Sequence, residues 1–239
     1  MKILSIIIPV YNEEKTVCDI LNKIENVVLL ENIKKELIII NDGSTDRSRI
    51  IIDEFKRKNK HLNMNVISHK TNIGKGASIH TGIKEAAGDY IIIQDADLEY
   101  EPEEYNSLLN PMINGTADVV FGSRFKGNKP HRILFLWHST GNKILTLLSN
   151  LCTNLNLTDM ETCYKMFNAS ILKSLNLKEK RFGFEPEVTA KISRIPDIRI
   201  YEVGISYYGR SYKEGKKINW KDGFRAIFCI LKYGLLRMK

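Results

Sequence analysis

The sequence YIIIQDAD occupies residues 90–97 and places a run of isoleucines directly before two acidic residues. An apolar run followed by polar residues recurs in ILSIIIPVYNE at 3–13 and in LIIINDGSTD at 37–46. Short apolar runs that alternate with amphipathic helical patterns are typical of the buried strands of a parallel sheet. The sequence therefore predicts an α/β fold with a mainly parallel, Rossmann-like sheet flanked by helices.

Outward from these runs, the first half of the chain contains five predicted strands and four predicted helices. The strands are Leu4–Val10, Leu37–Asn41, Met64–Ser68, Tyr90–Gln94 and Asp118–Gly122, and the helices cover 13–25, 46–59, 75–87 and 102–113. The second half predicts a Leu-rich helical region over 132–157, a helix over 185–194, a strand over 199–208 and a basic loop over 209–217. We expect one domain over 1–217, with halves 1–125 and 126–217, followed by a basic amphipathic helix over 218–239.

Three of the predicted strands end in a polar cluster. These clusters begin at Tyr11, Asp42 and Asp95. Ligands of open α/β sheets bind in a crevice outside the carboxyl ends of the strands. The three clusters therefore predict a single binding crevice.

Asp95 and Asp97 are the most specific candidates for chemistry. In an extended segment alternate side chains point the same way, so Asp-x-Asp directs two carboxylates together, and Glu99 continues the alternation. Without a cation the two carboxylates repel each other, whereas Mg²⁺ or Mn²⁺ would bind both and leave positions open for diphosphate oxygens. An isolated Asp-x-Asp is often structural; its place at the end of a strand favours a metal site.

Two glycine-containing segments have both a structural and a functional interpretation. In DGSTD at 42–46, glycine makes a turn and Ser44 or Thr45 caps the next helix, which leaves Asp42 free to accept hydrogen bonds from a nucleoside. In NIGKG at 72–76, Lys75 and Gly76 suit a phosphate at a helix start, although a simple turn explains them equally well. The spacing excludes a P-loop and a dinucleotide fingerprint.

Composition narrows the class of protein. The formal charge of +8 would attract nucleic acid, anionic lipid or phosphorylated substrates, but no nucleic-acid motif is present and we expect no such partner. Four scattered cysteines argue against a zinc site or a disulfide framework and favour a reducing cytoplasm. We expect no signal sequence, and no apolar run is long enough to span a membrane.

Four segments in this order resemble the family 2 glycosyltransferases. They are IPVYNEE at 8–14, NDGSTD at 41–46, QDADLE at 94–99 and FGSR at 121–124. The chain is most similar to the branch of dolichyl-phosphate mannose synthases and polyprenyl-phosphate glycosyltransferases. ETCYK at 161–165 and GRSYKEGKK at 209–217 extend the resemblance over nearly the whole chain.

The resemblance implies a GT-A fold, a donor half over 1–125, an acceptor half over 126–217 and a set of site residues. The donor-binding residues would be Pro9, Tyr11, Glu13, Asp42, Lys75, Gly76, Arg210 and Lys213, with Asp95, Asp97 and Glu99 holding Mg²⁺ or Mn²⁺. The acceptor-binding residues would be Arg124, His138, Asn142 and Lys165, and the catalytic residues Asp95, Asp97 and Arg124. His138 and Asn142 replace an Arg/Ser pair that the mannose synthases use on the acceptor phosphate; Asn41, Glu99 and Gly204 are milder departures.

The implied activity is metal-dependent, inverting transfer of a hexosyl group from a UDP- or GDP-sugar to a polyprenyl phosphate. A hydroxyl acceptor on a glycan or small molecule is the alternative, and it would need a general base, for which Asp159 and Glu161 are the candidates. A nucleotide-sugar pyrophosphorylase is disfavoured because no glycine-rich, lysine-containing loop follows the first strand. A basic nucleic-acid-binding module is a further alternative.

Membrane contact is a further expectation. Residues 133–137, ILFLW, and the terminal helix place aromatic side chains beside Lys and Arg, a composition typical of an interfacial helix. Packing of the helix on its own domain is the alternative. We expect a cytoplasmic protein, peripheral on the cytoplasmic face of a membrane, with a membrane-protein partner or a second copy of the chain as open alternatives.

Overall fold

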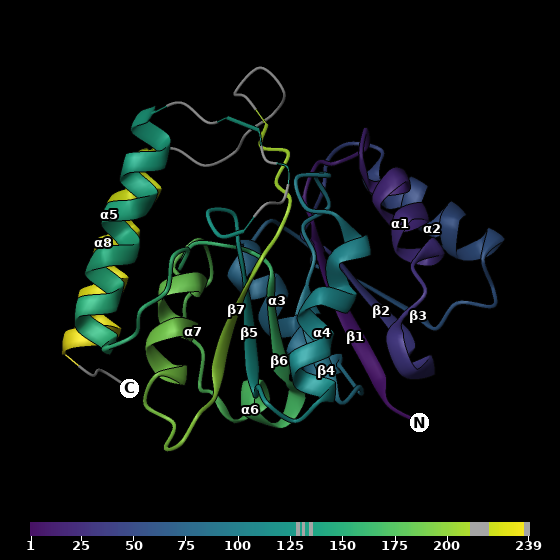
Figure 1. Cartoon of the computed structure of the whole chain (residues 1–239). Coiled ribbons are helices and arrows are strands. Elements are labelled where there is room, and N and C mark those ends of the chain that lie inside the picture. Colours follow the sequence, from purple (N-terminus) through teal and green to yellow (C-terminus); the bar gives the residue numbers. More distant parts are fainter. Residues whose placement is uncertain (128–129, 131, 134–135, 211–219, 237–239) are drawn as a thin grey trace.

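The computed structural model describes residues 1–127, 130, 132–133, 136–210 and 220–236 (Figure 1). Seven strands form one sheet in the order β3-β2-β1-β4-β6-β5-β7. Their bounds are β1 Ile3–Val10, β2 Lys34–Asn41, β3 Met64–Ser68, β4 Tyr90–Ile93, β5 Val119–Ser123, β6 Lys165–Asn168 and β7 Ile200–Gly204. All neighbours pair in parallel except β6, which is antiparallel to β4 and β5. The predicted α/β fold with a mainly parallel sheet is confirmed.

Strand β6 is the one strand of the sheet, as the structure describes it, that the sequence did not predict, and the short helix α6, Ala169–Ser174, that follows it was not predicted either. The four residues of β6, KMFN, carry neither a long apolar run nor an alternating pattern. The strand forms because β4 and β5 leave a gap between them that pairs on both sides with Met166 and Phe167. Through β6, the two halves of the chain share one sheet.

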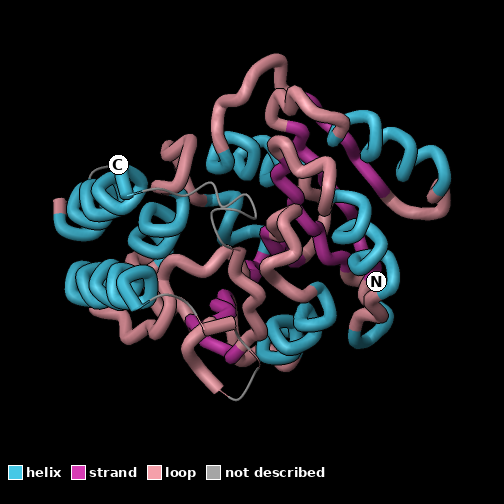
Figure 2. Tube along the Cα trace, turned by 90° about the horizontal axis from the view of Figure 1, so that it is seen from above, coloured by secondary structure: helices cyan, strands magenta, loops and turns pink. Residues whose placement is uncertain are grey.

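Helices cover both faces of the sheet (Figure 2). Their bounds are α1 Val17–Asn26, α2 Ser48–Lys58, α3 Lys75–Glu85, α4 Tyr105–Ile113 after a 3-10 turn at Pro102–Glu104, α6 Ala169–Ser174 and α7 Phe184–Ile192. Ile7 in β1 and Ile92 in β4 are fully buried, as wholly apolar strands covered on both faces require. Helix α3 approaches β1 so closely that a Cβ on Gly82 would lie 2.4 Å from Ile7 Cγ2, which explains a glycine inside this helix.

Two helices at one end of the molecule lie side by side and pack on α7 (Figures 1 and 2). They are α5, Leu136–Thr153, and α8, Trp220–Cys229, which continues as a π-helix over Ile230–Leu235. The predicted helical region over 132–157 is thus a shorter helix. None of the helices in the described part of the chain is long and apolar enough to cross a membrane.

Glu179 attaches this C-terminal segment to the domain. Its carboxylate accepts hydrogen bonds from Arg225 Nη2 at 2.6 Å, Tyr233 Oη at 2.8 Å and Lys232 Nζ at 3.2 Å. Burial opposes ionisation, but these three donors lower the pKa of Glu179 to about 2. The loop before helix α7 is therefore tied to α8 through Arg225, and to the π-helix through Lys232 and Tyr233.

Candidate active site

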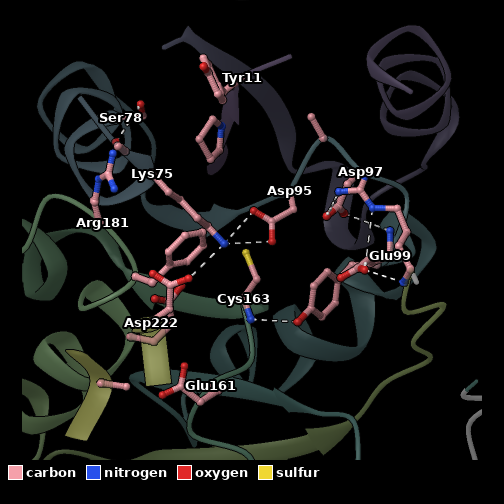
Figure 3. Close-up of a pocket in the computed structure, with 18 of the residues that line it drawn as sticks. Tyr11, Lys75, Ser78, Asp95, Asp97, Glu99, Glu161, Cys163, Arg181 and Asp222 are labelled. Carbon is pink, nitrogen blue, oxygen red and sulfur yellow. Dashed lines mark hydrogen bonds and ion pairs between the residues drawn. The ribbon is translucent and has the colours of Figure 1, made fainter. Parts of the chain in front are cut away.

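A cavity of about 750 Å³ lies at the carboxyl ends of β1, β2 and β4. The three predicted polar clusters meet there, since Tyr11, Asp42 and Asp95 all line it. Its volume is in the range that holds a cofactor or a substrate. Figure 3 shows Tyr11 at one end and Glu161 at the other, with Asp95 between them in this view.

The end of the cavity near Tyr11 is lined by the predicted nucleoside-binding residues Pro9, Glu13 and Asp42. The carboxylate of Asp42 is not free, which corrects our expectation. It accepts hydrogen bonds from the backbone N–H groups of Gly74 at 2.8 Å and Ile73 at 3.1 Å. These contacts fix Asp42 at the rim of the cavity.

His69 also contacts Asp42, and sequence analysis missed it. Its Nδ1 lies 2.8 Å from Asp42 Oδ1, and its Nε2 lies 3.0 Å from Thr81 Oγ1 on α3. The contact joins the residue after β2 to the residue after β3, 27 positions apart in the chain. No local pattern could have indicated this pair.

The hydroxyl of Ser44 does not cap the following helix as predicted. Ser44 Oγ instead accepts a hydrogen bond from the backbone N–H of Asn12, and Asn12 Oδ1 accepts one from Thr45 N–H at 2.8 Å. Helix α2 begins at Ser48, whose N–H donates to Asp46 at 2.9 Å. The turn after β2 is thus fastened to the turn after β1, which fixes the end of the cavity near Tyr11.

Lys75, in the first turn of α3, lines the cavity and reaches its centre. Its Nζ lies 2.8 Å from Asp95 Oδ1 and 3.7 Å from Glu185 Oε1. We expected Gly76 to make room for a phosphate, but its neighbour in the structure is the backbone of Glu179. A Cβ at position 76 would lie 2.2 Å from the Glu179 carbonyl oxygen, which is too close for any residue but glycine. The observed reason for glycine at 76 is therefore the close packing of the 179–181 loop on α3; a phosphate contact there stays a prediction.

Asp95, Asp97 and Glu99 all line the cavity and form its acidic centre. They lie beyond β4, which ends at Ile93, in a segment that turns at 96–97 and has Leu98 at a φ of 63°, and the predicted alternation of an extended segment is wrong here. Arg210 Nη2 lies 2.8 Å from Asp97 Oδ2, and the Arg210 N–H donates to Glu99 Oε1 at 2.6 Å. Arg210 also contacts Glu13 at 3.2 Å. Burial, together with repulsion from Asp95 and Glu99, raises the pKa of Asp97 to about 7 despite Arg210.

This donor set fits a divalent cation bound at an open site. Within the described residues, no three His, Cys, Asp or Glu side chains are grouped so that they could hold a metal ion, so the predicted set of three ligands is not assembled. Glu99 instead accepts hydrogen bonds from Tyr207 and Arg210, which leaves Asp95 and Asp97 as the candidate ligands. Asp95 and Asp97 repel each other, and Lys75 and Arg210 now balance their charge. Mg²⁺ and Mn²⁺ accept a few carboxylates and complete their shells with water or phosphate oxygens. A metal bound here would take its remaining ligands from a substrate.

Arg124 lines the cavity, but its guanidinium is already paired. Nε and Nη2 donate to the two oxygens of Asp159 at 2.6 and 2.7 Å, and Asn142 Nδ2 donates to Asp159 at 3.1 Å. Asp159 is fully buried. Although burial opposes it, Arg124 lowers the pKa of Asp159 below its ordinary value. Asp159 is therefore a counterion that positions Arg124, a role that makes it a poor general base.

Of the other predicted acceptor residues whose side chains the structure describes, Asn142 lines the cavity and Lys165 does not. Lys165 is fully buried in β6, where Nζ donates to the carbonyl of Thr162 and lies 5.1 Å from the centre of the Phe121 ring. It does not line the cavity, so the structure does not support the predicted acceptor contact. His138 lies in α5 but its side chain is outside the described part of the chain, as is the whole of Lys213.

Further residues reach the cavity without any signal in the sequence that we could interpret. Glu185 enters from the first turn of α7, Arg181 from the loop before it, and Asp222 from α8 (Figure 3). Glu161, which we considered only as a base, lines the end away from Tyr11. Burial, together with the charge of Glu185, raises the pKa of Glu161 to about 8.

The sheet order, with helices on both faces, defines an α/β fold of the GT-A type. The chain belongs to glycosyl transferase family 2, whose profile matches residues 5–175, and it is thus a nucleotide-sugar glycosyltransferase. The family resemblance of the four sequence segments is confirmed.

Relatives of known name cover nearly the whole chain. It is 29% identical over 245 residues to the UDP-N-acetylglucosamine–dolichyl-phosphate N-acetylglucosaminyltransferase of Methanococcus voltae, covering 96% of this chain and 95% of that protein. It is 26% identical over 228 residues to the dodecaprenyl-phosphate galacturonate synthase of Rhizobium johnstonii, covering 95% of this chain and 65% of that protein. Glucosyl-3-phosphoglycerate synthase from Mycobacterium tuberculosis, solved with Mn²⁺, UDP and phosphoglyceric acid, shares the fold, with a TM-score of 0.73, 19% identity and coverage of 97% of this chain and 78% of that chain.

Proposed function

We propose that this protein is a metal-dependent, inverting hexosyltransferase that moves a sugar from a nucleotide diphosphate to a polyprenyl phosphate. The observation that carries the donor part is the cavity at the strand ends, where Asp95 lies between Tyr11 and Glu161 in the view of Figure 3 and Asp97 lies to one side of Asp95. A nucleotide diphosphate sugar would then lie with its base near Tyr11, its diphosphate near Asp95 and its sugar beyond. Mg²⁺ or Mn²⁺, held by Asp95 and Asp97, would neutralise the diphosphate; Mn²⁺ and Mg²⁺ are both found in structures of the mycobacterial synthase.

The state of the candidate bases favours a phosphate acceptor. A hydroxyl acceptor must lose a proton to a base, whereas a phosphate arrives ionised. Of the two predicted bases, Asp159 is paired with Arg124 and does not line the cavity, and Glu161 is held largely protonated at neutral pH by its raised pKa. The names of the two relatives, which refer to dolichyl and dodecaprenyl phosphate, agree with this acceptor.

In the proposed reaction, an oxygen of the acceptor phosphate attacks the anomeric carbon from the side opposite the nucleotide. The bond from that carbon to the diphosphate breaks, and the diphosphate leaves with the electron pair, so the anomeric configuration inverts. Lys75 would pair with the negative charge of the leaving diphosphate, because its Nζ contacts Asp95, beside which the diphosphate is proposed to bind. Arg181 adds positive charge to the wall of the cavity, where the acceptor phosphate would approach, and Arg124 lines the same cavity as an ion pair with Asp159.

A lipid acceptor requires contact with a membrane, and α5 and α8 carry a suitable surface. Exposed apolar side chains recur at helical spacing on α5, on α8 and on the π-helix that continues α8, and they are Leu136, Ile144, Leu147, Leu151, Phe224, Phe228, Leu231 and Leu235. The same helices line the cavity through Leu145 and Ala226. We call these eight residues the apolar face and propose that it lies on the cytoplasmic face of an anionic membrane. The four free cysteines agree with a reducing compartment.

The test of this function is transfer of radiolabel from UDP- or GDP-sugars to a polyprenyl phosphate in detergent, with Mg²⁺ or Mn²⁺. We expect lipid-soluble label that depends on metal and falls at least about 100-fold in Asp97→Asn. Glu101→Gln is the matched control, since Glu101 bonds to Lys23 outside the cavity, and it should retain activity. Release of nucleotide without lipid-soluble label, or label moving to a glycan hydroxyl, would contradict the proposed acceptor.

A further inference from the structure

Glu161 is a partly buried acidic side chain, and among the described residues one of its two carboxylate oxygens is buried without a hydrogen-bond partner. The residue lines the cavity, yet within the described part of the chain its Oε1 is buried and has no hydrogen-bond partner. Buried polar atoms in folded proteins almost always have a partner, because an unpaired one loses its contacts with water. An unpaired oxygen beside a cavity therefore indicates a partner that binds there.

The position of Glu161 limits what this partner can be. Its strongest charged neighbour is Glu185, and Glu185 Oε1 lies 3.7 Å from Lys75 Nζ, which contacts Asp95 at 2.8 Å. Contacts thus lead from Asp95, where the diphosphate is proposed to bind, through Lys75 to Glu185, and the charge of Glu185 acts on Glu161. The group covalently attached to the diphosphate lies next along this path, and in a nucleotide sugar that group is the sugar.

The chemistry of the two side chains points to the same ligand. Two neighbouring carboxyl groups would repel an anionic phosphate, particularly when Glu185 is ionised. Sugar hydroxyls are neutral and both donate and accept hydrogen bonds, so they can pair with a carboxylate and with a protonated carboxyl at once. The raised pKa of Glu161 keeps a proton on this side chain that it can donate.

From this geometry we infer that Glu161 is a specificity-determining residue that hydrogen-bonds a hydroxyl of the donor sugar, next to Glu185. The inference rests on the proposed donor site but not on the acceptor. It assigns Glu161 a role in choosing the sugar, in place of the base role that a hydroxyl acceptor would need. It also explains why an unpaired oxygen is retained at this position, since the sugar would satisfy it.

Titration calorimetry without acceptor tests the inference. UDP-glucose, UDP-N-acetylglucosamine and GDP-mannose are each compared with UDP or GDP in the presence of Mg²⁺, for the wild type, Glu161→Ala, Glu161→Gln and Glu101→Ala. In Glu161→Ala we expect the nucleotide sugar that the wild type prefers to bind about ten-fold more weakly, with the affinity for free nucleotide unchanged. Glu161→Gln keeps a neutral donor and should stay within about three-fold of wild type, and Glu101→Ala should match wild type.

The melting temperature of the unliganded protein separates this role from a structural one. Glu161→Met removes an unpaired buried oxygen, and we expect it to raise the melting temperature while losing the preference for nucleotide sugar. A lower melting temperature in both Glu161→Met and Glu161→Gln would assign Glu161 to the core and overturn the inference. Equal weakening of nucleotide and nucleotide sugar would also overturn it, as would a wild type that binds no nucleotide sugar more tightly than the nucleotide. Selective loss of sugar binding without any transfer to polyprenyl phosphate would support it while refuting the proposed acceptor.

Discussion

At the scale of single residues, the acidic side chains of this site differ in function because their surroundings differ. Asp159 is paired with Arg124, and its pKa is lowered, whereas Glu161, on the same segment, has no such partner and its pKa is raised. Asp97 lies between these cases, because Arg210 only partly offsets burial and the charges of Asp95 and Glu99. Three carboxylic side chains of the same chemistry therefore have different roles: Asp159 is a counterion, Glu161 is a carboxyl group that keeps its proton, and Asp97 is a candidate metal ligand.

Glu161 makes stability depend on pH. Its pKa is about 8 in the folded protein and near the ordinary 4.5 when unfolded, so between these values the folded state holds one more proton. The free energy of unfolding therefore falls as pH rises from about 5 to 8, by up to about 1.4 kcal/mol per pH unit. Glu185, Asp159, Lys165 and Arg124 are the charged groups that act on this carboxyl.

Chemical denaturation from pH 5 to 8 measures this dependence. We expect Glu161→Gln to have a shallower slope than the wild type, because its amide does not titrate. The remaining slope in the variant should keep the same sign, since the pKa of Asp97 is also raised. Parallel curves for the two proteins would show that Glu161 is ionised in the folded state at neutral pH.

At the scale of elements, helix α3 sets the geometry of the cavity because it packs tightly on β1. In Gly82→Ala, the new methyl group would approach Ile7 Cγ2 to 2.4 Å and push the helix away from the strand. We expect a loss of about 1–2 kcal/mol, even though alanine favours helix. Gly141→Ala in α5 is the control, since no described atom lies within 4 Å of its Cβ, and it should gain about 0.5–1 kcal/mol. Urea denaturation gives both values, and equal signs would contradict this account of the packing.

We also expect the C-terminal helix to depend for its attachment on Glu179. Glu179→Ala leaves Arg225, Lys232 and Tyr233 without their shared acceptor. We expect a loss of about 2 kcal/mol, less than for a wholly buried pair because the Arg225 side chain is half exposed. Thermal and urea unfolding measure it against Glu54→Ala, an exposed position on α2 that should change stability by less than about 0.5 kcal/mol.

At the scale of the whole molecule, the cavity and the apolar face share the same two helices. One side of α5 and α8 lines the cavity through Leu145 and Ala226, and the other exposes the apolar face. If the apolar face lies on a membrane, a lipid phosphate can reach the cavity without leaving the interface. The arrangement agrees with the proposed acceptor and with attachment that needs no spanning helix.

Flotation with liposomes containing anionic lipid at low salt tests this surface. Leu147→Glu combined with Phe228→Glu places two charges in the apolar face, and we expect the bound fraction to fall several-fold. Ile50→Glu is the matched control, because Ile50 is 51% exposed on α2, away from this end, and should bind as the wild type does. If the wild type fails to float, or if all three proteins float equally, the apolar face is not the membrane contact.

The sequence alone determined the parallel sheet and the placing of the acidic centre. A strand that is covered on both faces has mostly apolar side chains, so β1, β2 and β4 can be recognised in the sequence by their runs of isoleucine. The polar residues that follow these runs must then lie at the carboxyl edge of the sheet. The position of Asp95 and Asp97 directly after β4 placed both at this edge, although the chain turns there and does not continue the extended alternation that we predicted. These are local rules, and the family resemblance rests on the same segments.

Only the tertiary structure decided which charges remain available in the cavity. Arg124 meets Asp159 across 35 positions, Asp42 is fastened to the start of α3 by backbone hydrogen bonds, and Lys165 is buried because β6 enters the sheet. Glu185 reaches Lys75 through the packing of α7 against the rest of the domain. Sequence periodicity specifies which face of an element is buried, but the partner that each polar group finds depends on how distant elements pack, and that pairing sets whether a side chain can bind a substrate.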